Sequence, residues 1–275
     1  MDENKVLVPA GTKKEKAGKE IVDYFSGFDF TKLEISTEEM FKNGVHFGHH
    51  KSRKNPKMDE FIFGVKNGIS ILDLQKTEQK LKEALGFIEK IVNDGQKILF
   101  VGTKKQAKKI VEEAAKRCEM PYVSERWLGG TFTNYPVIFK RARYLREGQE
   151  KMEKGEYGKY TKFEQMKIVE ELERLEVKMG GIKYMEKLPG AIFVASVIED
   201  NLAIKEAKIK HIPVIAFADS NVDPRDVDYI IPSNEDAVSS LRLLMAYIIK
   251  TVLMTKQKML IEKVAMDKAT VEVKK

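Results

Sequence analysis

The sequence predicts a doubly wound α/β fold, a three-layer arrangement of the flavodoxin or Rossmann kind in which helices cover both faces of a parallel sheet. Two stretches, Ala191–Ala195 and Pro213–Ala218, are almost continuously apolar, which is typical of parallel strands buried on both faces. From about Gly68 onward, such stretches alternate with segments whose apolar residues recur at helical spacing. A long, highly charged helical segment interrupts the alternation, so we expect a helical hairpin, packed as an antiparallel coiled coil, between two strands.

The elements follow in order along the chain. Residues 1–20 mix Lys and Glu with few apolar groups, so the N-terminal extension 1–36 is expected to be partly disordered or to dock on a neighbour. Ser36 begins an N-cap pattern for a short helix that ends near Gly44. Strands are predicted at 69–74, 97–102, 122–123, 191–195, 213–218 and 228–231, and helices at 77–92, 104–117, 201–210 and from an Asn234 cap to about 254.

The inserted hairpin spans 137–181 and turns at 155–158, where two glycines occur. Its first leg is basic at its start and its return leg is acidic, so opposite charges are expected to pair across the two legs. The α/β domain is then discontinuous, over 37–136 and 182–255, and residues 256–275 form a basic C-terminal tail.

Composition limits the class of protein. The 275 residues include 49 Lys and Arg against 42 Asp and Glu, a formal net charge of +7, and 43% of them are hydrophobic. This excludes a disordered polymer and suits a partner rich in phosphate. The single cysteine, Cys118, allows no intrachain disulfide, which favours a cytosolic setting. No signal-peptide pattern is expected at the N-terminus, and the apolar stretch Leu241–Met254 is predicted to be too short and too charged to cross a bilayer.

The segment 42–58 is rich in Lys, Arg and His and contains no acidic residue. Exposed cations and amides on a loop with glycines suit phosphate oxygens and sugar hydroxyls, although a solvated basic face is the alternative interpretation. His46, His49 and His50 lie in this segment, but the further ligands that a zinc site needs are missing nearby. No metal and no cofactor are therefore predicted.

A second basic element, Gly102–Lys105, follows a predicted strand and opens a predicted helix, where backbone amides bind anions. It lacks the second glycine and the Lys-Ser/Thr pair of a Walker A loop, and it is not a dinucleotide fingerprint. An ordinary capped helix is one interpretation. The other is a doubly wound enzyme or nucleotide-binding protein with its phosphate site at Gly102–Lys105.

Two further segments are unusual in composition. Glu125–Asn134 holds the only tryptophan, Trp127, and a Gly-Gly pair, which suits a loop that approaches a partner closely or a structural crossover into the hairpin. The aspartates within 219–228 could bind Mg²⁺, but the neighbouring Asn and Pro residues favour acidic turns. Motifs of serine, zinc and cysteine hydrolases are absent from the sequence, so no catalytic residue is predicted.

Six short stretches are distinctive enough to be compared with known families: His46-Phe47-Gly48-His49, Asn55-Pro56-Lys57-Met58, Phe100–Lys104, Arg126–Thr131, Ala218–Asn221 and Ile231–Ala237. Together, and in this order, they resemble the signature stretches of the ribosomal protein S2 family of the bacterial small subunit. The resemblance extends from about Thr37 to Met254.

The resemblance implies a non-enzymatic, cytoplasmic, ribosome-bound protein. It implies docking on the back of the small subunit between head and body, binding to small-subunit rRNA, late joining during assembly, and help in recruiting ribosomal protein S1 for translation initiation. Neighbouring small-subunit proteins are the other expected partners, and neither a membrane nor a second copy of the chain is expected. A hairpin that binds proteins on an otherwise inert domain remains a further alternative.

Basic groups would neutralise rRNA phosphates, and amides would set the register of the contact. The candidate rRNA-binding residues are Lys42, His46, His49, Lys51, Arg53, Lys54, Asn55, Lys57, Lys104, Lys105, Arg126, Asn134, Arg141, Arg143 and Arg146.

Overall fold

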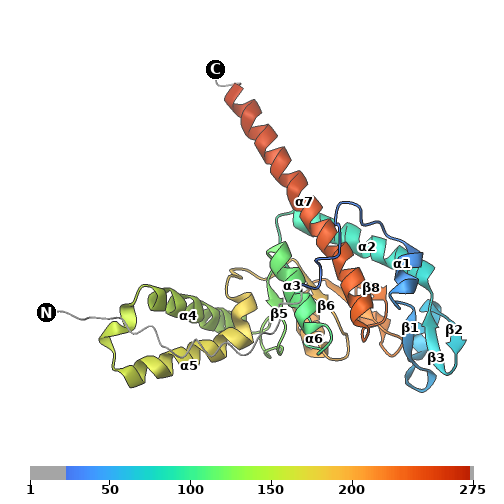
Figure 1. Ribbon diagram of the computed structural model, residues 1–275, viewed down its shortest axis with the longest axis horizontal. Helices are drawn as coiled ribbons and strands as arrows, with labels where there is room; N and C mark the ends of the chain where they lie inside the picture. Colours follow the sequence, from blue (N-terminus) through green and yellow to red (C-terminus); the bar gives the residue numbers. More distant parts are fainter. Residues whose placement is uncertain (1–22, 273–275) are drawn as a thin grey trace.

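The computed structural model describes residues 23–272, and a five-stranded parallel sheet forms their centre (Figure 1). The strand order is β5-β4-β6-β7-β8. Numbered from β4, this is the flavodoxin-like order 2-1-3-4-5, so the predicted doubly wound fold is confirmed. The strands are β4 (Ile98–Val101), β5 (Tyr122–Val123), β6 (Ala191–Val194), β7 (Val214–Ala218) and β8 (Tyr229–Pro232).

Alternate residues of each strand enter two separate apolar cores. Phe100, Phe193 and Phe217 face one side of the sheet, and the rings of Phe193 and Phe217 meet edge to face with centroids 4.9 Å apart. The residues between them in the strands, such as Ile192 and Ala216, face the other side of the sheet. There they pack in one core with Trp127 and with residues at the base of the hairpin. Because both faces are buried, the strands read as continuous apolar runs. The first core is covered by α2 (Leu74–Asn93), α3 (Lys108–Cys118) and α7 (Val238–Glu272), and the second by α6 (Asn201–Ile209).

A second, antiparallel sheet lies beside the first and was not expected. It consists of β1 (Phe47–His50), β2 (Ile62–Lys66) and β3 (Ile69–Leu72) in the order β1-β3-β2, and it is preceded by α1 (Thr37–Lys42). The strand predicted at 69–74 exists, but its assignment to the parallel sheet is wrong. Asn67 and Gly68 have φ of 52° and 79° and form the two-residue turn that pairs β3 with β2.

The predicted hairpin is confirmed and projects from one end of the molecule (Figure 1). Its legs are α4 (Tyr135–Glu153) and α5 (Lys162–Met179), and Thr161 and Glu164 cap α5 reciprocally. Leu145 and Leu172 are buried where the legs meet. The prediction of ion pairs between the two legs is wrong. Within residues 23–272, the ion pairs of the hairpin, such as Arg143 with Glu147, join residues of the same leg. The buried side chains between the legs are apolar, and a polar contact across them is a hydrogen bond from the Gln149 amide to Glu176 at 2.8 Å.

The last helix, α7, is longer than predicted, because it continues to Glu272. The predicted Asn234 cap is wrong, because the helix begins only at Val238; the Asn234 Oδ1 instead accepts from the backbone N–H of Asp236 and Ala237 and closes the turn before it. Part of this helix, Val238–Ile261, has the length and composition of a membrane span. Most of that part is buried in the protein, and Leu244 and Ile248 lie fully within the first core. A core helix has the same composition for this reason.

Residues 23–35 lie along α3 and α7 of the same chain. Phe25 is buried in the first core, the Arg242 Nε donates to the Tyr24 carbonyl at 2.7 Å, and the Lys250 ammonium donates to the Leu33 carbonyl. This part of the N-terminal extension therefore docks within the chain. Residues 1–22, for which partial disorder is predicted, lie outside the described residues.

A single buried carboxylate, Glu206 of α6, holds the crossover from β5 to the hairpin. It accepts from the Trp127 indole at 3.2 Å and from the backbone N–H of Gly130, Phe132 and Thr133 at 2.7, 2.9 and 3.2 Å. Burial disfavours its charged form, but these N–H donors outweigh burial and hold the pKa of Glu206 below its ordinary value. The loop that carries Arg126 and Asn134 is thus fixed from inside the protein.

We predict that Glu206→Gln destabilises the protein by about 2–4 kcal/mol at neutral pH, because an amide brings N–H groups against the N–H donors of the loop. Denaturant unfolding measures the change. Glu199→Gln is the matched control, because Glu199 is exposed in the turn that precedes the same helix, and it should change the stability by less than about 0.5 kcal/mol. Equal stabilities of the two variants would contradict the role given to Glu206.

Candidate nucleic-acid interface

The basic segment 42–58 is bound to the carboxyl edge of the parallel sheet. The His49 N–H donates to the Ser220 Oγ at 2.8 Å, and the Asn55 N–H donates to the Ser220 carbonyl at 2.9 Å. The Asn234 N–H, after β8, donates to the Val45 carbonyl at 3.0 Å. A side chain at Gly48 would place its Cβ 2.8 Å from the Ser220 Oγ, so this approach requires glycine. The loops after β7 and β8 therefore hold the segment in place.

Three candidate cations of this segment face solvent. Lys42 ends α1, and Lys51 and Arg53 lie in a short 3-10 helix, η1 (Lys51–Arg53). All three are exposed, and within residues 23–272 none of them forms an ion pair. Exposed ammonium and guanidinium groups on an anchored backbone can bind phosphate oxygens.

The next cations are already neutralised. The Lys54 ammonium lies 2.6 Å from Asp59, and the Lys57 ammonium lies 2.5 Å from Asp223. Asn55 caps the following 3-10 helix, η2 (Pro56–Phe61), by accepting from the Lys57 N–H. Two charges of the predicted basic segment are therefore paired with carboxylates outside it: Asp59 directly follows the segment, whereas Asp223 is far away in sequence.

The two candidate histidines lie below the surface. His46 is 7% exposed and stacks on Phe41 with ring centroids 4.4 Å apart, and burial lowers its pKa. His49 Nδ1 lies 3.0 Å from Asp219, whose hydrogen bond raises the pKa of the imidazole, and His49 Nε2 lies 3.5 Å from Asp236. Both rings serve internal contacts and offer little surface to RNA.

Sequence analysis missed one group that could hold a divalent cation. His49, Asp219 and Asp236 place one imidazole nitrogen and two carboxylate oxygens within 4.8 Å of one another, a donor set that suits zinc or a related ion. These residues are far apart in sequence, so spacing gave no signal. The other aspartates of 219–228 serve turns and local pairs, as the turn interpretation predicts: Asp223 caps a 3-10 helix, η5 (Pro224–Asp226), and Asp228 accepts from the Val214 N–H.

The predicted phosphate site at Gly102–Lys105 is filled by carboxylates. It lies between β4 and β6, the switch point where doubly wound proteins bind ligands. Thr103 donates its hydroxyl to Asp200 at 2.9 Å, and Lys104 lies 3.0 Å from Glu235 and 2.7 Å from Asp236. The helix begins at Lys108 rather than at 104, so its first N–H groups are not presented here. A phosphate would meet three negative charges, which argues against the nucleotide-binding alternative.

The remaining candidates lie on the loops that follow β4 and β5. Lys105 and Arg126 are exposed, and Asn134 precedes α4. Trp127 is a core anchor, because it is buried and meets the Phe132 ring edge on.

The hairpin arginines do not form one surface. Arg143 and Arg146 are three residues apart on α4 and are neighbours, whereas Arg141 is two residues from Arg143 and points to another face. Arg143 also pairs with Glu147 at 2.8 Å.

The Asp200 carboxyl, at the switch point of the sheet, is buried and has a raised pKa. Asp200 is 1% exposed, and burial raises its pKa from 3.8 to about 6, although the Thr103 hydrogen bonds act in the opposite direction. Because the folded state holds this proton more tightly than the unfolded state, stability from this group is present below pH 3.8 and is lost as the pH rises through about 6.

We predict that Asp200→Asn removes this loss. Between pH 4.5 and 7, the unfolding free energy of the variant should gain about 2 kcal/mol relative to the wild type, since one pKa unit corresponds to about 1.4 kcal/mol. Denaturant unfolding of both proteins across this range measures the difference. A difference that does not vary with pH would contradict the assignment of the raised pKa to Asp200.

Comparison with protein families agrees with the motifs and the fold. The family model described as Ribosomal protein S2 matches residues 40–255, which is well over half of the 275 residues. The matched range contains both sheets, the hairpin and the anchored basic segment. We conclude that the chain belongs to the ribosomal protein S2 family and is a non-enzymatic structural component of the small ribosomal subunit, which binds rRNA and other small-subunit proteins in the cytoplasm.

Proposed function

We propose that the segment 42–58 is the principal rRNA contact, and that the protein docks with it at the back of the small subunit, between head and body. The observation that supports this is the combination of exposed cations with an anchored backbone. Lys51 and Arg53 carry charges that no carboxylate within residues 23–272 neutralises, and the hydrogen bonds to Ser220 hold the segment before RNA binds. A preformed site loses less conformational entropy on binding.

We also propose that the protein joins the small subunit late during assembly. A protein that docks between the head and the body needs both RNA domains to be folded before its site exists. The cations that face solvent lie on α1 and η1, while those on the hairpin lie at the other end of the molecule (Figure 1). We propose that the hairpin arginines Arg141 and Arg146 make secondary contacts that add to the affinity only after the segment 42–58 is bound.

We further propose that the antiparallel sheet takes part in recruiting ribosomal protein S1. An aromatic patch, defined as Phe41, Phe47 and Phe63, is exposed by 61%, 46% and 81%. Phe41 and Phe63 line a hollow of about 870 Å³ together with His46 and Ile71. Exposed aromatic side chains around a hollow are typical of protein-binding surfaces, and S1 is the partner that the family resemblance implies.

We predict that replacing Lys51 and Arg53 by alanine weakens binding to the small subunit and flattens its salt dependence. Each lost phosphate contact lowers the slope of log K against log salt by about 0.7–0.9, so two contacts lower it by about 1.5. Sedimentation of the full chain with purified subunits at several salt concentrations measures the slope.

The matched control replaces Lys54 and Lys57 by alanine. Because these two lysines pair with Asp59 and Asp223, their loss should flatten the slope less. If the two double variants have equal slopes, the segment's exposed cations are not the principal contact. If neither differs from the wild type, the rRNA contact lies elsewhere.

For the aromatic patch, we predict that Phe63→Ala with Phe47→Ala removes S1 from small subunits without releasing the chain itself. Phe63 is 81% and Phe47 46% exposed, and neither belongs to a buried core, so folding should be little affected. The amount of S1 per purified subunit is measured by gel densitometry. Phe163→Ala, an exposed phenylalanine on the hairpin, is the control and should retain S1. Full S1 occupancy in the patch variant would contradict the proposal.

A further inference from the structure

The turn between β2 and β3 is an Asn-Gly step at an exposed position. Asn67 and Gly68 have φ of 52° and 79°, in the left-handed region that these two residue types adopt at least cost. In the part of the chain that the structure describes, the Asn67 side chain is exposed and forms no hydrogen bond, and the Gly68 N–H donates to no acceptor. The carboxamide and the neighbouring nitrogen are therefore both free to react.

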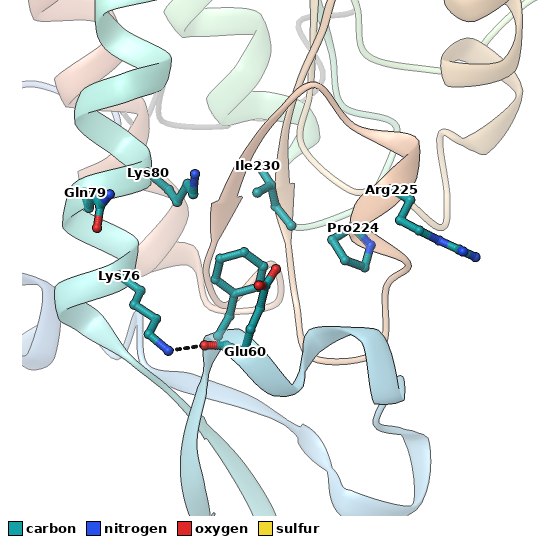
Figure 2. Close-up of a pocket in the computed structure, with 8 residues that line it drawn as sticks. Glu60, Lys76, Gln79, Lys80, Pro224, Arg225 and Ile230 are labelled. Carbon is teal, nitrogen blue, oxygen red and sulfur yellow. Dashed lines mark hydrogen bonds between the residues drawn. The ribbon is translucent and has the colours of Figure 1, made fainter.

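The β2–β3 ribbon is fastened at its base, whereas its tip is more lightly held. At the base, the Lys76 ammonium donates to the Glu60 carbonyl and ties η2, which precedes β2, to α2 (Figure 2). At the tip, the Gly68 carbonyl accepts from the Lys51 N–H at 2.8 Å, a bond that does not use the Gly68 nitrogen. An exposed turn at the end of a short ribbon opens locally at a low cost in free energy, so its backbone can reach the geometry that ring closure needs.

The chain contains a second Asn-Gly step, Asn43-Gly44, which directly follows α1. Here the Asn43 amide nitrogen donates to the Glu39 carbonyl at 2.9 Å, and the Gly44 N–H donates to the Phe41 carbonyl at 3.0 Å. Both nitrogens of this step are therefore held by hydrogen bonds within the helix end. Two steps of the same sequence thus differ in whether their reacting groups are free.

We propose that Asn67 is a site of spontaneous deamidation, and that its modification weakens the rRNA contact of the segment 42–58. The Gly68 nitrogen attacks the side-chain carbonyl carbon of Asn67, the carbon–nitrogen bond of the carboxamide breaks, and ammonia leaves with the proton of the Gly68 N–H. Water then opens the cyclic imide at either of its carbonyl carbons and gives aspartate or isoaspartate. Water is the only co-reactant, and no group is oxidised or reduced. Reactions of this kind make asparagine a thermolabile residue.

The effect on RNA binding rests on the proposed function, because it acts on the same segment. Both products carry a carboxylate where Asn67 is neutral, and the turn that carries it is hydrogen-bonded to the backbone of Lys51. The new charge attracts the exposed cations of the segment and repels the phosphates that they bind. Isoaspartate also adds a carbon atom to the main chain before Gly68, which displaces the carbonyl that holds Lys51.

The test incubates the purified full chain at physiological temperature and pH and follows both steps by mass spectrometry, with a digest at the start as the reference. Trypsin cleaves after lysine, so Asn67 begins the peptide 67–76 and Asn43 begins the peptide 43–51. The peptide 67–76 should convert to a mixture of isoaspartate and aspartate forms. Asn43 should react about thirtyfold more slowly, which corresponds to about 2 kcal/mol for its two hydrogen bonds. Equal rates, or a faster reaction at Asn43, would overturn the site.

Partly modified protein is then sedimented with a limiting amount of small subunits that lack the chain. The modified peptide should be at least about twofold rarer among bound than among free chains, which corresponds to about 0.4 kcal/mol, the interaction of unit charges about 10 Å apart in water. Asn67→Asp should reproduce this depletion without incubation. Asn67→Gly keeps the turn but cannot react, so as the matched control it should keep its affinity on incubation. An even distribution of the modified peptide, or an equal loss of affinity in Asn67→Gly, would overturn the link to RNA binding.

The two measurements separate this proposal from the proposed function. The reaction at Asn67 is followed without RNA, so an unreactive Asn67 overturns the modification site and leaves the contact at 42–58 standing. If the Lys51 and Arg53 double variant sediments like the wild type, while Asn67 reacts and its modified form is depleted from bound chains, the principal contact at 42–58 is overturned and the modification site stands.

Discussion

The interface depends on the hydrogen bonds that fasten the segment 42–58 to the carboxyl edge of the parallel sheet. Ser220, after β7, accepts from the His49 N–H and gives its carbonyl to the Asn55 N–H. In doubly wound proteins this edge is where ligands bind. Here the chain's own segment covers it, so the edge becomes an internal junction and the cations of the segment turn outward. The protein therefore presents charged groups on its surface, whereas an enzyme of this fold would have a crevice for its substrate here.

Buried carboxylates also occupy the positions at this edge where a ligand would otherwise bind. Asp200 and Glu235 occupy the switch point and bind Thr103 and Lys104, and Glu206 gathers the N–H groups of the loop after β5. In each case a fixed side chain satisfies donors that an anionic ligand could otherwise use. The net charge of +7 is therefore expressed at the surface, where Lys51 and Arg53 lie, and the interior of the same edge is acidic.

The limits of sequence reasoning here have a physical cause. The strands around Phe193 and Phe217 could be predicted, because burial on both faces leaves a continuous apolar run. The strands β1 and β2 could not, because they are short, half exposed and contain Gly48 and Gly64. At the interface, the exposure of Lys51 agrees with its predicted role. The neutralisation of Lys57 could not be foreseen, because its partner lies 166 residues away.

The surfaces proposed here for rRNA and for a protein partner both lie in the region before the first parallel strand. The segment 42–58 and the aromatic patch both precede β4 in the chain. Each is held by contacts to the α/β body, such as the Asp73 N–H to the Phe61 carbonyl at 2.9 Å. Because the parallel sheet is buried on both faces, it can change little without losing stability. This constraint supports the proposal that recognition chemistry lies in the small sheet and its flanking turns, with the large sheet as their rigid support.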